Sequence, residues 1–89
     1  MKTVWKFPID TPRDIFSMVM PKGAETLTVQ TQGSRPCIWA LVDPMKEDEE
    51  RHFEIHGTGH SIYPVNNLKY INTFQMEEGS LVFHLFERA

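Results

Sequence analysis

Polar and apolar residues alternate along most of this chain, and this pattern constrains the fold more than any other feature. Residues 26–32, Thr-Leu-Thr-Val-Gln-Thr-Gln, are the clearest example. A period of two is typical of a strand that buries one face, whereas a helix repeats apolar residues every three or four positions. Similar patterns occur in residues 4–9, 52–56 and 68–76, and the apolar runs at 15–20 and 81–86 are also interpreted as strands. The sequence therefore predicts an all-β, mainly antiparallel fold, either a small β-sandwich or a partly open barrel of about seven short strands.

Two loops predict hairpins. Gly33 begins a two-residue loop between residues 26–32 and 36–42, which is typical of a type II′ turn. A two-residue loop places Val29 opposite Ile38 and Leu27 opposite Ala40, whereas a three-residue loop shifts the register by one residue and exchanges the faces. Near the C-terminus, a two- or four-residue loop at 77–80 places Phe74 opposite Phe83 and Met76 opposite Leu81.

Two segments are apolar on almost every position, residues 37–42 and 81–86. Strands of this kind are typically covered on both faces, so the segment 37–42 should be central to the fold. A chain of 89 residues has few elements with which to cover two such surfaces. We therefore expect a homo-oligomer, most simply a dimer. Phe16, Met18 and Met20 are interpreted as core residues, with an exposed contact surface as the alternative.

The acidic segment 43–51 interrupts the strand pattern. Asp43 and Pro44 are suited to begin a helix, but no apolar stripe follows that would dock it onto the body of the protein. We expect a solvated connection with at most one short helix at 44–50. The alternative is an acidic patch that binds a partner.

Charge and composition exclude several classes of function. Twelve acidic and nine basic residues give a net charge of −3 without a basic block, so nucleic acid is not expected as a partner. Cys37 is the only cysteine, which excludes an intrachain disulfide and suits a reducing cytosol. Neither a signal-peptide pattern nor an apolar run that could span a bilayer is present, so we expect no membrane association and no export.

The most site-like stretch is residues 53–60, where a strand leads into two glycines between two histidines. The candidate binding residues are His56, Gly57, Thr58, Gly59 and His60. His52, His56 and His60 recur every four residues, a spacing that would line up metal ligands on a helix, but Gly57 and Gly59 disfavour a helix here. On a strand, His52 and His56 would lie about 13 Å apart, too far for one metal ion to bridge. Two imidazoles that converge across the turn fall short of the three or four ligands of a zinc site, with His84 as the only other histidine. We therefore predict no metal and no cofactor, and the alternative to a binding site is a plain structural turn.

Catalytic patterns are absent from the sequence. It contains no serine-nucleophile motif, no paired carboxylates in an apolar setting and no cysteine–histidine pair at a recognisable spacing. The prediction is a protein that is not an enzyme and has no catalytic residues.

Several segments together resemble a family of small uncharacterised proteins encoded by bacteriophages and prophages. They are residues 4–9, 20–24, 39–44, 57–60 and 70–75. The resemblance implies a phage setting and no established activity, so it assigns no site residues. It favours a small non-enzymatic phage accessory protein that binds a host protein, such as a defence or regulatory factor, in the host cytoplasm. The alternatives are a structural or assembly component of the virion and a small-ligand-binding protein that uses the 56–60 turn.

Overall fold

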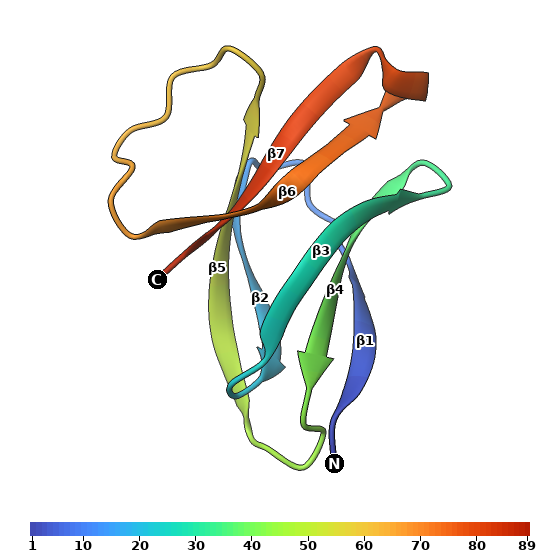
Figure 1. Ribbon diagram of the computed structural model, residues 1–89, viewed down its shortest axis with the longest axis vertical. Helices are drawn as coiled ribbons and strands as arrows, with labels where there is room; N and C mark the ends of the chain where they lie inside the picture. The colour runs from blue at the N-terminus through green and yellow to red at the C-terminus, as the bar shows by residue number, and fades with distance from the viewer.

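The computed structural model describes residues 1–89 and contains seven strands in two antiparallel sheets (Figure 1). The strands are β1 (Thr3–Pro8), β2 (Ile15–Pro21), β3 (Glu25–Gln32), β4 (Arg35–Val42), β5 (Asp48–Gly57), β6 (Leu68–Met76) and β7 (Leu81–Arg88). The order is β1-β4-β3 in one sheet and β2-β5-β7-β6 in the other. This arrangement confirms the predicted all-β fold and identifies it as a sandwich. The only helical turn is η1 (Glu77–Gly79), and no helix is long or apolar enough to cross a membrane.

The core lies between the two sheets and is built mainly from alternate positions of their strands, with Ile9 and Ala24 added from the adjoining turns. Its buried residues are Ile9, Met20, Ala24, Val29, Ile38, Ala40, Val42, Phe53, Phe74 and Leu85. Phe16 and Met18 pack against this cluster beside the fully buried Met20, which confirms their interpretation as core residues. Burial of each large apolar side chain contributes about 1.5–3 kcal/mol, so this layer supplies most of the drive to fold.

The β3–β4 hairpin has the predicted two-residue loop, with Gly33 at a φ of +65°. Val29 lies opposite Ile38 as expected, but Thr26 rather than Leu27 lies opposite Ala40. The register shifts between Thr26 and Thr28, so a β-bulge at Leu27 changes the face of every residue before it. The predicted pairing of Leu27 is therefore wrong, although the loop length is right.

The β6–β7 hairpin has the predicted register, with Phe74 opposite Phe83 and Met76 opposite Leu81. The rings of Phe74 and Phe83 lie 5.8 Å apart between centroids, close enough for an aromatic pair. The loop turns through left-handed backbone, with φ values of +52° at Glu77, +56° at Glu78 and +91° at Gly79.

Strands β3 and β6 lie side by side although no ladder joins their sheets (Figure 1). The side-chain amide of Asn72 on β6 connects the two strands by hydrogen bonds to the backbone of β3. The backbone N–H of Val29 donates to Asn72 Oδ1 at 2.7 Å, and Asn72 Nδ2 donates to the carbonyl of Val29 at 3.2 Å. The hydroxyl of Thr31 adds a bond to the carbonyl of Gln75 at 2.7 Å. These bonds connect the two sheets along one side of the sandwich.

The acidic segment differs from the prediction, because residues 48–51 begin strand β5. Glu49, Glu50 and Arg51 pair with Met20, Val19 and Met18 of β2. Only residues 43–47 form the connection, and no helix forms at 44–50. The charged residues are accommodated because Glu50 is exposed, while Arg51 points inward and donates to Glu87 Oε2 at 2.6 Å and to the carbonyl of Ala24 at 2.8 Å.

Strand β4 is central to its sheet as predicted, since β1 and β3 flank it. One face is fully buried through Ile38, Ala40 and Val42. The other face is only partly covered, because Trp39 and Leu41 remain half-buried. The expectation that this strand is covered on both faces is therefore wrong for a single chain.

Candidate functional site

The predicted site residues lie where β5 ends and a long connection to β6 begins. Gly57 is the last residue of β5, and the N–H of His60 donates to the carbonyl of Gly57 at 3.1 Å to close a tight turn. Gly59 has a φ of +85° within this turn. The local structure follows from the glycines, which permit a reversal that residues with side chains would resist.

His56 and His60 lie on opposite faces of β5. The imidazole of His60 occupies the space beside Gly57, where a Cβ atom would come within 2.9 Å of His60 Cε1. Because successive positions on a strand point to opposite faces, His56 points away from that ring. The two imidazoles do not converge, and no group of three or more His, Cys, Asp or Glu side chains is arranged to hold a metal ion.

His56 instead belongs to a charged cluster on the outer face of the four-stranded sheet. Its Nε2 lies 2.9 Å from Glu54 Oε1, while Arg88 Nε donates to Glu54 Oε2 at 2.5 Å. Arg88 also donates to the carbonyls of Pro64 and Asn66 at 3.3 Å, which ties the 58–67 loop to this face. Glu54 lies on the outer face of β5 and is nevertheless only 6% exposed.

The hydrogen bond from Arg88 lowers the pKa of Glu54 below its ordinary value of 4.5. Burial acts in the opposite direction, and the hydrogen bond with His56 lowers the pKa further. Glu54 is therefore ionised at neutral pH and accepts hydrogen bonds on both oxygens. A carboxylate held in this way is poorly suited to donate a proton, so its role is to anchor Arg88 and His56.

Thr58 belongs to a second network on the same face. Its Oγ1 lies 2.7 Å from His84 Nε2, His84 Nδ1 lies 2.8 Å from the hydroxyl of Thr73, and that hydroxyl lies 2.5 Å from the hydroxyl of Tyr70. A hydroxyl beside an imidazole resembles a nucleophile and its base. The far side of His84 meets a hydroxyl, however, and not the carboxylate that stabilises an imidazolium in a catalytic triad. The arrangement is suited to fixing the loop to β6 and β7.

Sequence reasoning missed Arg88, Tyr70 and Thr73, and considered His84 only as a further metal ligand. The missing information was the pairing of β5 with β7, which places Glu54 opposite Phe86 and His56 opposite His84. These strands are separated by the whole of β6, so no local pattern indicates that they are neighbours.

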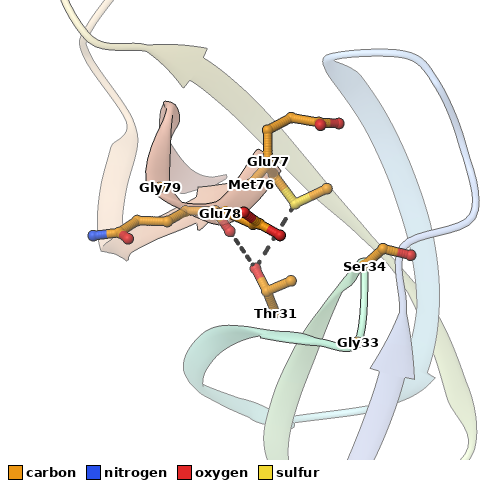
Figure 2. A pocket seen from close by; sticks show the side chains of 8 residues that line it. Thr31, Gly33, Ser34, Met76, Glu77, Glu78 and Gly79 are labelled. Atoms are coloured by element: carbon orange, nitrogen blue, oxygen red, sulfur yellow. Dashed lines mark hydrogen bonds between the residues drawn. The ribbon is translucent and has the colours of Figure 1, made fainter.

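A polar depression lies between the β3–β4 and β6–β7 turns (Figure 2). Its lining is Thr31, Gly33, Ser34, Gln75, Met76, Glu77, Glu78 and Gly79. The hydroxyl of Thr31 points toward β6 and already donates to the carbonyl of Gln75. The two glutamates are exposed, and neither carboxylate forms a hydrogen bond with the hydroxyl of Thr31 or Ser34.

The outer face of the three-stranded sheet carries a partly exposed apolar patch. Val4 lies opposite Leu41, and Lys6 lies opposite Trp39 with its Nζ 5.9 Å from the indole ring centroid. We call Val4, Lys6, Trp39 and Leu41 the tryptophan face. Val4 is 51% exposed, and Trp39 and Leu41 are half-buried. The patch contains a tryptophan, a residue type that is enriched among the energetic anchors of protein interfaces.

Comparison with known proteins places the chain in a family. A family model described as a domain of unknown function, DUF7352, matches residues 1–89. The chain belongs to the DUF7352 family. The match covers all seven strands and confirms the expected membership of an uncharacterised family, whose description states no activity. No curated protein and no solved structure matches the chain.

Alanine substitutions of the two glycines in the 56–60 turn test whether this turn has a structural role. Gly59→Ala should lower the free energy of unfolding by about 1–2 kcal/mol, because alanine is strained at the positive φ of this residue. Gly57→Ala is the matched control, since its added Cβ meets only the end of the exposed His60 side chain, which can move away. Urea denaturation of both variants measures the difference. A larger loss for Gly57→Ala than for Gly59→Ala would contradict this assignment.

Proposed function

We propose that this protein is a small non-enzymatic accessory protein of phage origin that binds a host protein through its tryptophan face. The observation that carries the proposal is the partly exposed apolar surface beside the central strand of the three-stranded sheet. One face of β4 is buried in the core, while Trp39 and Leu41 on the other face are half-buried beside the 51% exposed Val4. The outer face of such a sheet is normally polar.

The physical character of this face suits a protein partner. A tryptophan contributes a large contact area, and its neighbours Val4 and Leu41 extend the apolar surface along one direction. Lys6 lies over the ring and also donates to Gln32 Oε1 at 2.7 Å, so polar groups border the patch on this side. Buried aromatic residues within a polar rim are the usual centres of binding energy at protein interfaces.

The other candidate surfaces are less available to a partner. Most of the polar residues on the outer face of the four-stranded sheet already bond to one another or to the 58–67 loop. The separation of His56 and His60 on opposite faces also disfavours a small ligand held between them. The phage setting rests on the resemblance of several sequence segments to small phage and prophage proteins, and a defence or regulatory factor in the host cytoplasm is the corresponding partner.

Substitution of the tryptophan face tests this proposal. Trp39→Ala should weaken capture of the host partner by about 2 kcal/mol, or roughly 30-fold in the dissociation constant, because the central aromatic anchor is lost. Tyr63→Ala is the matched control, since Tyr63 is 94% exposed on the 58–67 loop. Affinity capture from host lysate with mass spectrometry identifies the partner, and titration with the purified partner gives the two constants. Equal binding by the wild type and a folded Trp39→Ala variant would refute the proposal.

A structural component of the virion is the second candidate, because a compact sandwich with open sheet edges is suited to assembly. Mass spectrometry of purified virions separates the two candidates. Stoichiometric amounts in the particle would overturn the host-binding proposal, whereas absence from the particle would exclude the structural role.

A further inference from the structure

Strand β2 is an unusual edge strand. It lies at the end of the four-stranded sheet, and β5 is the only strand alongside it. Its sequence, Ile-Phe-Ser-Met-Val-Met-Pro, makes it the only one of the seven strands without a charged residue. Ile15 and Val19 are 67% and 58% exposed on its outer face. Proteins usually protect such edges with lysine, early proline or a bulge, and β2 has none of these before Pro21.

The backbone groups on the free edge follow from the hydrogen bonds at the two ends of β2. The N–H of Ile55 donates to the carbonyl of Asp14, and the N–H of Lys22 donates to the carbonyl of Glu47, both at 2.7 Å. The register between β2 and β5 has no shift from one end to the other. Because antiparallel ladders alternate with a period of two, the even-numbered residues bond to β5 and the odd-numbered residues point away from it.

The odd-numbered residues therefore present a row of free groups. Ile15, Ser17 and Val19 each offer a backbone N–H and a C=O, whereas Pro21 is buried and lacks an N–H. None of these groups bonds to a loop or to a side chain elsewhere in the chain, apart from the Pro21 carbonyl, which accepts from Ala24. This row has the spacing of a strand edge and is ready to pair with another strand.

We propose that β2 pairs antiparallel with β2 of a second copy of this chain, about a two-fold axis at Met18. Asp14 and Lys22 are exposed and flank the uncharged strand four residues on either side of Met18. Within its own chain, the side chain of Lys22 has only a 4.0 Å contact with the exposed carboxylate of Glu47. Antiparallel pairing about Met18 therefore brings Asp14 of each copy opposite Lys22 of the other, at both ends of the contact. This charge complementarity identifies a second copy as the occupant of the edge.

The same register matches the free backbone groups. Ser17 of one copy lies opposite Val19 of the other, so each pair can exchange two N–H···O=C bonds. Ile15 lies opposite Pro21, which is buried and whose carbonyl already accepts from Ala24, so the two Ser17–Val19 pairs supply the four backbone hydrogen bonds of the contact. An axis at Ser17 would instead place Asp14 opposite Met20 and leave the charges unmatched. The four-stranded sheets of the two copies then form one continuous sheet, and Ile15 and Val19 of both copies lie on the same face of it.

The oligomeric state of the wild type, of an edge variant and of charge-exchange variants tests this inference. The full-length wild type should be a dimer by light scattering at high micromolar concentration. Val19→Lys should be monomeric with an unchanged circular-dichroism spectrum, because position 19 is exposed and a lysine at an edge opposes pairing. Asp14→Lys and Lys22→Asp should each raise the dimer dissociation constant about tenfold. The double variant should restore it, since the exchange keeps opposite charges face to face.

Other outcomes would overturn the inference. A monomeric wild type, or a Val19→Lys variant that remains dimeric, excludes pairing through this edge. Failure of the double variant to restore the dimer excludes the register about Met18. A wild type that is monomeric alone but loses a host partner on Val19→Lys shows that a strand of another protein occupies the edge. Trp39→Ala should remain dimeric, which separates this interface from the tryptophan face, and its dissociation to monomers would place the contact on that face instead.

Discussion

Replacement of Phe53 by alanine should lower the free energy of unfolding by about 3–5 kcal/mol. Phe53 has no exposed surface and lies in β5, which is paired on both sides, with β2 and with β7. Its ring stacks on that of Phe16 with 5.7 Å between centroids. The variant leaves a cavity where the two sheets meet, and the rigid ladders on either side prevent the structure from collapsing into it. Urea denaturation followed by circular dichroism measures the loss.

A second phenylalanine provides the matched control. Phe7 packs against the same core but lies on the edge strand β1 and is only partly buried, so Phe7→Ala should cost clearly less. Both substitutions remove the same atoms, and the difference therefore reports on the position in the sandwich. Equal losses, or a loss below about 1 kcal/mol for Phe53→Ala, would contradict the central place of β5 in the core.

Much of this fold is readable from local sequence. Alternation of side chains identifies strands because it reflects the geometry of each strand separately. Short loops then fix the register of neighbouring strands, as the pairing of Phe74 with Phe83 and of Val29 with Ile38 demonstrates. These features depend on residues that are close along the chain, so a pattern in the sequence is sufficient to find them.

The errors arise where partners from distant strands decide the structure. Arg51 follows an acidic run that has low strand propensity, yet it is drawn into β5 because Glu87 and the carbonyl of Ala24 satisfy its guanidinium. The bulge at Leu27 allows Thr26 to point inward and donate to Glu87 Oε1 at 2.8 Å. The inclusion of Arg51 in β5 and the bulge at Leu27 both depend on contacts with β7, so the neighbouring sequence does not indicate either feature.

The candidate site shows the same limit. Glycines at 57 and 59 indicated a turn, which the structure contains, but two histidines near a turn do not reveal which faces they occupy. Alternation along residues 52–56 is consistent with Glu54 on the outer face of β5 but does not indicate its burial, because burial there depends on Arg88 from the last strand. Whether the 56–60 turn binds a ligand stays a prediction.

Arg88→Met should be among the most damaging substitutions, with a loss of about 3 kcal/mol at pH 7. Glu54 would remain buried without its principal partner, and the carbonyls of Pro64 and Asn66 would lose their donor. Methionine retains much of the length and apolar character of the arginine stem, so the loss reports mainly on the missing charge and hydrogen bonds. Urea denaturation at a series of pH values measures it.

The pH dependence identifies Glu54 as the cause. In the wild type, the folded-state pKa of Glu54 is lowered below 4.5. Its stabilisation is therefore fully present above pH 4.5 and is lost as the pH falls through the lowered value. In Arg88→Met, the main cause of the lowered pKa is gone while burial still raises it. Protonation then relieves an unfavourable buried charge, so the difference in stability between wild type and variant should shrink from pH 7 to pH 4.

The control removes the charge from the other partner. In a Glu54→Gln background, the buried group is neutral at every pH, so Arg88→Met should cost less at pH 7 and its cost should not change between pH 7 and pH 4. The glutamine can still accept a hydrogen bond from His56, which keeps the rest of the cluster comparable. If Arg88→Met costs the same at both pH values in the wild-type background, the arginine acts through its contacts with the 58–67 loop and not through the carboxylate of Glu54.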